Sequence, residues 1–264
     1  MQKLVDINCD MGESFGAYTI GMDEAVLGHI SSANIACGFH AGDPMVLDRT
    51  VAMAAAKGVG VGAHPGYPDL MGFGRRNMHC SNAEVRNYLI YQVGAVQAFC
   101  RVHGVALQHV KPHGGLYNMA VEDEALARTI AEAVAAVDRG LLLVALAGAN
   151  AARVRAMAAE VGLQVCFEAF PDRAYTARGT LVSRRKPGAV IEDPQTVAQR
   201  ALMMAAEGKV VAEDGSVLEL TVDTLCVHGD NPAAVNLTGT IRQTLLDAGV
   251  GVAPMAEIVR LRDA

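Results

Sequence analysis

Short apolar segments alternate with longer segments of amphipathic pattern along nearly the whole chain. A short, continuous apolar segment is typical of a buried parallel strand. On this basis the sequence predicts seven strands, at residues 4–7, 32–36, 59–63, 105–110, 141–147, 163–167 and 224–227. The longer segments predict helices at residues 44–57, 81–103, 123–137, 150–160, 194–206 and 233–248.

Local signals support several of these boundaries. Pro44 suits the first position of a helix, because its missing N–H would have no partner there. Ser81 and Glu84 have the spacing of a capping box. Asn150 is expected to cap the helix that follows it, and residues 210–220 resemble an inserted hairpin.

The order of the predicted elements indicates the architecture. Strands that alternate with helices are typical of a parallel sheet with helices outside it. No segment rich in proline, glycine or serine divides the chain. We therefore predict one α/β domain over residues 1–264, an irregular seven-stranded (β/α) barrel. An open, doubly wound sheet is the alternative, because it has the same alternation of elements.

Polar residues gather directly after six of the seven predicted strands. In chain order they are Asp6, Asn8, Asp10 and Glu13; Asn34, Cys37, His40 and Asp43; His64, Asp69, Arg75 and Arg76; Lys111 and His113; Glu168, Asp172, Arg173 and Tyr175; and His228, Asp230 and Asn231. In a parallel barrel the carboxyl ends of all strands lie on one rim, where active sites are found. The sequence therefore predicts one functional site on this rim.

Half of the histidines belong to these clusters, namely His40, His64, His113 and His228. The others are expected to have structural roles, namely His29, His79, His103 and His109. Glycine-rich turns with the sequences CGFHAGD, AHPGYPD and KPHGG accompany three clusters. Glycine permits sharp turns and close approach of a ligand. Tight turns alone would explain these glycines but not the histidines beside them.

Composition excludes several classes of protein. The net charge is −6, aromatic residues make up 5%, and no basic stripe is visible, so nucleic-acid binding is not expected. The longest apolar run, residues 141–149, is about half of a membrane span, and the first residues do not resemble a secretory signal. The six cysteines form no CxxC pair. We therefore expect a cytoplasmic protein with no membrane partner.

Common catalytic motifs give little guidance. The patterns GxxxxGK[ST], HExxH and GxSxG do not occur. Residues 72–76 combine two glycines with Arg75 and Arg76, so flexible backbone amides and two guanidinium groups could bind a phosphate or carboxylate. An exposed basic loop without a ligand is equally compatible with this segment.

Six long sequence blocks resemble the LamB/YcsF family. They are DINCDMGESFG (6–16), SANIACGFHAGDP (32–44), GAHPGYPDLMGFGRR (62–76), KPHGGLYN (111–118), EAFPDRAY (168–175) and CVHGDNP (226–232). The resemblance implies a (β/α) barrel similar to polysaccharide deacetylases. It also implies a cytoplasmic role in a 5-oxoprolinase, which opens 5-oxoproline (pyroglutamate) to L-glutamate with ATP. The resemblance further implies that two partner subunits, B and C, share this work.

This activity sets chemical requirements. A lactam is a poor electrophile, but ATP with Mg can phosphorylate its oxygen, after which water attacks the activated carbon. The site then needs a base for water, cations for the phosphoryl charge and an acid for the ring nitrogen. The expected catalytic residues are Asp10, His64, Lys111, His113, Asp172, His228 and Asp230. The expected substrate- or phosphate-binding residues are Asn8, Glu13, His40, Arg75, Arg76 and Arg173.

Two other functions remain open at this point. The first is a metal-dependent amide or acetyl hydrolase, in which zinc or another divalent ion lowers the pKa of a bound water. Its candidate ligands are Asp10, His40, His64 and His113. The second is a non-catalytic subunit that binds the substrate.

Overall fold

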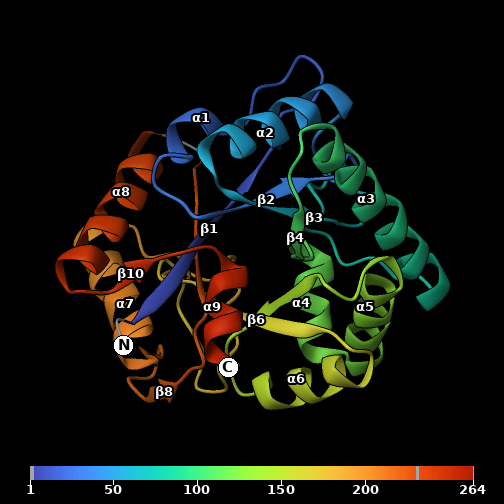
Figure 1. Ribbon diagram of the computed structural model, residues 1–264. Helices are drawn as coiled ribbons and strands as arrows, with labels where there is room; N and C mark the ends of the chain where they lie inside the picture. The colour runs from blue at the N-terminus through green and yellow to red at the C-terminus, as the bar shows by residue number, and fades with distance from the viewer. Residues whose placement is uncertain (1–2, 230–231, 264) are drawn as a thin grey trace.

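The computed structural model describes residues 3–229 and 232–263, and a closed barrel of parallel strands lies at its centre (Figure 1). In these ranges the barrel consists of β1 (Leu4–Met11), β2 (Ser32–Ala36), β3 (Gly60–His64), β4 (Leu107–Val110), β5 (Leu142–Leu146), β6 (Gln164–Ala169) and β9 (Thr224–Val227). Strand β9 pairs with both β6 and β1, and Asn8 lies opposite Cys226 where the barrel closes. The seven-stranded (β/α) barrel is confirmed, and the open-sheet alternative is wrong.

Helices cover the outside of the barrel (Figure 1). Those that the sequence predicts are α2 (Pro44–Lys57), α3 (Asn82–Val102), α5 (Glu124–Val137), α6 (Ala151–Glu160), α7 (Pro194–Glu207) and α8 (Pro232–Asp247). The predicted capping box is present, because Ser81 and Glu84 each accept a hydrogen bond from the other's backbone amide. The predicted hairpin is formed by β7 (Lys209–Val211) and β8 (Val217–Glu219).

Some elements are not predicted from the sequence. They are α1 (Asp23–Val26), α4 (Gly114–Glu122), β10 (Gly251–Val252) and α9 (Met255–Arg262). Two glycines begin α4, and glycine is a poor helix former, so this segment resembles a turn in the sequence. Asn150 is the N-cap residue of α6, as expected, but its side chain makes no capping hydrogen bond. Its side-chain amide instead donates to the carbonyl of Val121 at 3.0 Å.

Strand β1 is longer than predicted and contains residues that the sequence pattern places after it. Successive side chains of a strand point to opposite sides. Ile7 and Cys9 belong to the apolar core. Asp6, Asn8 and Asp10 instead bond to polar side chains of other strands inside the barrel. The interior of the barrel is therefore polar along β1, and it forms the floor of the site.

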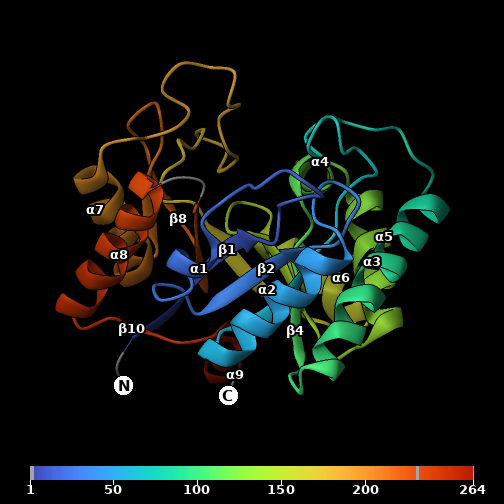
Figure 2. The same cartoon turned by 90° about the horizontal axis from the view of Figure 1, so that it is seen from above.

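Long connections rise from one end of the barrel (Figure 2). Two of them follow β3 and β6, so they lie at the carboxyl ends of the strands. These connections are available to wall a site at that end, as is usual for parallel barrels. Within the described ranges, none of the helices combines the length and the apolar character needed to cross a membrane.

Candidate active site

A cavity of about 620 Å³ opens at the carboxyl ends of the strands, within the size range of small-molecule sites. The predicted site residues that line it are Asp10, Glu13, His64, Arg75, Arg76, Lys111, His113, Arg173 and His228. Asn8, His40 and Asp172 are not part of this lining. Asp230 lies outside the described residues. The structure thus brings most of the predicted site residues to one cavity.

Lys111 lies on the floor of the cavity, directly after β4. Its Nζ atom is 3.0 Å from Oδ1 of Asp10 and 2.7 Å from Oε1 of Glu168. It also donates to Oδ1 of Asn8 at 3.2 Å. Burial disfavours the ammonium, but the carboxylates, Asp10 first, outweigh it and hold the pKa of Lys111 well above its ordinary value. Lys111 is therefore a permanent buried cation.

The carboxylate of Asp10 is held from three sides. Its Oδ1 accepts hydrogen bonds from Asn34 at 2.9 Å and from Lys111. Its Oδ2 lies 3.2 Å from Nε2 of His64. Burial raises the pKa of Asp10, but His64 and Lys111 outweigh that and lower it well below the ordinary value. Asp10 therefore supplies a fixed negative charge beside His64.

Backbone carbonyls fix the orientation of His64 and His113. Nδ1 of His64 is 2.7 Å from the carbonyl oxygen of Lys111, and Nε2 of His113 is 2.7 Å from that of Phe73. A carbonyl oxygen only accepts, so both of these nitrogens donate. The other two nitrogens, His64 Nε2 and His113 Nδ1, lie 2.9 Å apart. Burial is the main reason that the pKa of His113 is lowered to about 3.

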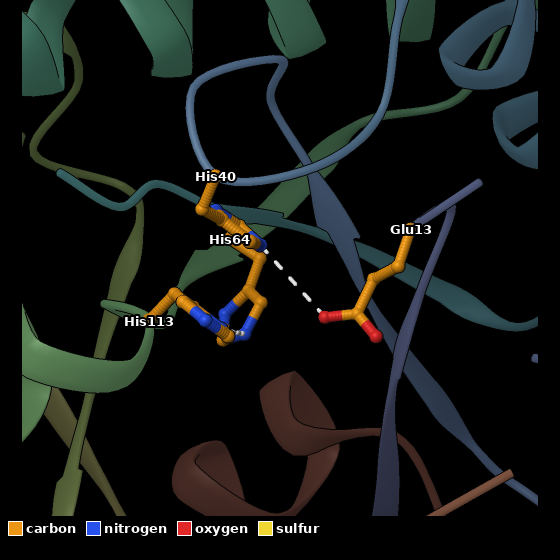
Figure 3. A group of neighbouring side chains, drawn as sticks. All are labelled: Glu13, His40, His64 and His113. Atoms are coloured by element: carbon orange, nitrogen blue, oxygen red, sulfur yellow. Dashed lines mark hydrogen bonds and ion pairs between the residues drawn. The ribbon is translucent and has the colours of Figure 1, made fainter. Parts of the chain in front are cut away.

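His40 stacks on His113, and Figure 3 shows Glu13 facing His40 on the other side of the group. The two imidazole rings are parallel, with centroids 3.7 Å apart. His40 is fully buried, and neither of its ring nitrogens has a hydrogen-bond partner in the structure. A Cβ atom at Gly74 would lie only 2.7 Å from the Cβ of His40, so glycine is needed there. The close packing of these rings therefore depends on the glycine-rich loop.

A second titratable pair lies elsewhere on the cavity. Nδ1 of His228 is 2.9 Å from Oδ2 of Asp172, and Nε2 of His228 is 3.4 Å from the guanidinium of Arg184. Burial lowers the pKa of His228, but the carboxylate of Asp172 outweighs burial and raises it above the ordinary value. The predicted partner Asp230 lies outside the described residues, and among the described residues Asp172 forms an ion pair with His228.

The neighbouring arginines Arg75 and Arg76 differ in their contacts. Arg76 forms an ion pair with the buried Asp69 within the same loop. Arg75 has its guanidinium 5.1 Å from the centroid of the Phe73 ring, and its side chain lines the cavity. Arg75 is therefore better placed than Arg76 to contact an anionic ligand.

Arg173 is largely engaged by its own loop. Its Nε donates to the carbonyl of Ala189 at 3.2 Å and its Nη2 to that of Val182 at 2.6 Å. The same loop brings Arg184 and Arg185 to the cavity, and neither is among the predicted site residues. These two arginines are consecutive in the sequence, in the loop that follows β6. Two neighbouring basic residues after a barrel strand are the sequence signal that could have identified them.

Three further residues, which the sequence does not single out as catalytic or ligand-binding, also belong to the site. Glu168 is fully buried at the end of β6 and pairs with Lys111. The Sγ atom of Cys226 lies 3.3 Å from Nζ of Lys111, and Asn34 donates to Asp10. Glu168 and Asn34 belong to the predicted polar clusters, whereas Cys226 looks like a core residue in the sequence.

The described residues include a group that could hold a metal ion. Glu13, His40, His64 and His113 each offer one ligand atom, and these atoms lie within 4.8 Å of one another. Imidazole and carboxylate are the ligands that zinc and similar transition metals prefer. The buried nitrogens of His40 have no protein partner, so the donor set fits such an ion.

Comparison with known proteins identifies close relatives. A protein of Syntrophobacter fumaroxidans, named as the A subunit of 5-oxoprolinase, is 56% identical over 250 residues, covering 95% of this chain and 98% of that protein. A protein of Thermococcus onnurineus with the same name is 53% identical over 256 residues, covering 97% of this chain and 99% of that one.

Solved structures agree with these matches. The lactam utilization protein from Thermus thermophilus has a TM-score of 0.88 and 48% identity, covering 95% of this chain and 99% of that one. The catalytic domain of a peptidoglycan N-acetylglucosamine deacetylase from Eubacterium rectale has a TM-score of 0.52 and 12% identity, over 96% of this chain and 89% of that one. The second match shows a shared fold alone. The LamB/YcsF family model matches residues 5–260, and the chain therefore belongs to the LamB/YcsF family.

Proposed function

We propose that this chain is the A subunit of a 5-oxoprolinase. The enzyme opens 5-oxo-L-proline to L-glutamate while ATP is hydrolysed to ADP and phosphate. The observation that carries this proposal is the 56% identity to the A subunit of a 5-oxoprolinase over 95% of this chain. The cavity supports it, because the buried cation Lys111 and the histidines His64 and His228 line the same small space.

The partners in this proposal are subunits B and C of the same enzyme. Both relatives carry the name of one subunit, which indicates that their enzyme has more than one. We place the complex in the cytoplasm, and the cysteines support this. Every cysteine in the described ranges is free, as is usual in a reducing compartment.

The cations of the cavity would bind the anionic parts of the reaction. Phosphorylation of the lactam oxygen by MgATP makes the adjacent carbon electrophilic and adds phosphoryl charge. Lys111 is a buried cation on the cavity floor, and Arg75 lies on the cavity wall. Arg184 and Arg185 add positive charge from the loop that follows β6. We assign these groups to the phosphoryl oxygens and the substrate carboxylate.

The two titratable pairs would move the protons. Water attacks the activated carbon as His64 accepts its proton, and the carboxylate of Asp10 stabilises the resulting imidazolium. The carbon–nitrogen bond then breaks as His228 gives its proton to the nitrogen and the new hydroxyl group releases its proton to solvent. This leaves an acyl phosphate, which a second water hydrolyses to glutamate and phosphate. The pKa of His113 is lowered to about 3, which makes it a weak base, so we assign the base role to His64.

An activity assay tests the proposal. Glutamate and ADP are measured with 5-oxoproline for the chain alone and with subunits B and C, each with and without MgATP. We expect glutamate only when all subunits and ATP are present. Turnover without ATP would contradict the proposal and favour the metal-dependent amide hydrolase, for which the histidine cluster is the supporting observation. Full activity after substitution of Lys111 would favour a non-catalytic binding subunit.

A further inference from the structure

We propose that Glu13, His40, His64 and His113 bind one divalent transition-metal ion of the zinc type. These four side chains converge from loops and strand ends at one wall of the barrel mouth (Figure 3). The proposal rests on three separate observations: the anchored rings of two histidines, the unpartnered nitrogens of a third, and the type of ligand atoms. It does not depend on the oxoprolinase assignment.

The first observation concerns His64 and His113. Each donates its outer ring N–H to a backbone carbonyl, at 2.7 Å in both cases. This is the arrangement found behind metal-ligating histidines, because it fixes the ring and leaves the other nitrogen as a lone pair. The two inner nitrogens lie only 2.9 Å apart. Two facing lone pairs at this distance repel unless a cation or a proton lies between them.

The second observation concerns His40. Its side chain is fully buried, and both ring nitrogens lack a hydrogen-bond partner in the structure. Buried polar atoms in folded proteins are nearly always satisfied, so an exception calls for a bound ion or water. Nε2 of His40 is 3.8 Å from Oε1 of Glu13, too far for a hydrogen bond but suitable for two ligands of one ion.

The spacing is slightly wider than a bound ion requires. Ligands of a tetrahedral zinc ion at about 2.1 Å lie about 3.4 Å from one another. The ligand atoms here lie within 4.8 Å of one another, so they must move closer together when an ion binds. His40 is parallel to His113, and one ion cannot lie in both ring planes. A rotation of His40 meets this need, because no hydrogen bond holds its ring.

The ligand types select the class of metal. Three imidazoles and one carboxylate suit zinc, cobalt or a similar ion, whereas magnesium and calcium prefer oxygen ligands. Asp10 adds a fixed negative charge, with Oδ2 at 3.2 Å from Nε2 of His64. A zinc-type ion held here would occupy Nε2 of His64 and lower the pKa of a bound water to about 7, so it would replace His64 as the group that activates water.

Calorimetry on the full chain tests the proposal without any enzyme assay. The protein is treated with a chelator and titrated with zinc chloride, with magnesium chloride as the comparison. We expect one zinc site per chain and no binding of magnesium. His40→Ala and His113→Ala should each weaken zinc binding by about 100-fold or more, since even loss of an outer hydrogen-bond partner costs 10–100-fold. His79→Ala, an exposed loop histidine, is the matched control and should bind as wild type.

Circular dichroism shows whether each variant folds, and anomalous diffraction from zinc-soaked crystals of the wild-type chain gives a readout independent of variants. Anomalous density between His64 and His113 supports the proposal. Zinc that fails to bind the wild-type chain overturns it, and so does density elsewhere. Zinc retained by folded His40→Ala or His113→Ala overturns the ligand assignment.

Discussion

The Nζ atom of Lys111 lies 2.7 Å from Oε1 of Glu168, and both side chains are buried inside the barrel. The same ammonium contacts Asp10, so two carboxylates from β1 and β6, the strands on either side of β9, share one cation. Such an arrangement stabilises the fold only while all three groups are present, because each charge compensates for the burial of the others. The ion pairs at the floor of the cavity therefore contribute both to the stability of the fold and to the charge of the site.

Replacing this cation should destabilise the protein. In Lys111→Met, the carboxylates of Asp10 and Glu168 stay buried without their shared partner. We expect the free energy of unfolding to fall by about 3–5 kcal/mol, the usual cost of breaking a buried ion pair. Urea unfolding followed by circular dichroism measures this. Lys57→Met, at the exposed end of α2, should change stability by less than about 1 kcal/mol. Similar losses in both variants would contradict the prediction.

The ion pair between His228 and Asp172 predicts that the stability of the protein depends on pH. The pKa of His228 is raised in the folded protein, because Asp172 outweighs the effect of burial. This pair therefore contributes stability that is fully present below the ordinary pKa of 6.5. The contribution is lost as the pH rises through the folded-state pKa.

Asp172→Asn should lower the pKa of His228 and remove this part of the pH dependence. A nuclear magnetic resonance titration of the His228 ring, with urea unfolding from about pH 5 to about pH 9, measures both effects. In the proposed enzyme, turnover should also fall as His228 loses its proton at high pH. An unchanged pKa of His228 in Asp172→Asn would show that Asp172 does not control it.

Much of the architecture could be predicted because it depends on local signals. Apolar segments bounded by turns marked the barrel strands, and the Ser81–Glu84 spacing marked the start of α3. The end of β1 was misplaced because aspartate and asparagine are rare in strands. The barrel accepts Asn8 and Asp10 there because Lys111 and hydrogen-bonding neighbours satisfy them.

The candidate site could be predicted only as a region. Parallel strands bring their carboxyl ends together, so the polar clusters were expected on one rim. Which groups pair depends on side-chain packing over long sequence separations. The pairing of His228 with Asp172, and of Lys111 with Glu168, has no local signature in the sequence. The loop contacts that engage Arg173 are equally invisible before the chain folds.

His113 should be dispensable for assembly but required for turnover. It lies at the cavity, where strand β4 passes into α4, rather than within the apolar core. In the proposed enzyme, we expect His113→Ala to form a complex with subunits B and C, as measured by size-exclusion chromatography. Its glutamate production should fall by about 100-fold or more, the usual contribution of a positioned proton-transfer or ligand group. Wild-type turnover by this complex would make His113 a structural turn residue.

Arg75 and Arg76 offer a matched comparison of two adjacent cations. Arg76 is committed to Asp69, whereas the guanidinium of Arg75 stacks near Phe73 and faces the cavity. In the proposed enzyme, loss of one charge-assisted hydrogen bond costs about 1.5–3 kcal/mol, so Arg75→Ala should raise the KM for ATP about tenfold or more. Arg75→Ala should leave the melting temperature unchanged, because Arg75 forms no ion pair in the described ranges. Arg76→Ala should lower the melting temperature instead, since it frees the buried carboxylate of Asp69.

Steady-state kinetics and thermal unfolding of both variants separate these effects, with Lys57→Ala as the surface control. If Arg75→Ala left the KM for ATP at the control value, the 72–76 loop would not contact the nucleotide phosphates.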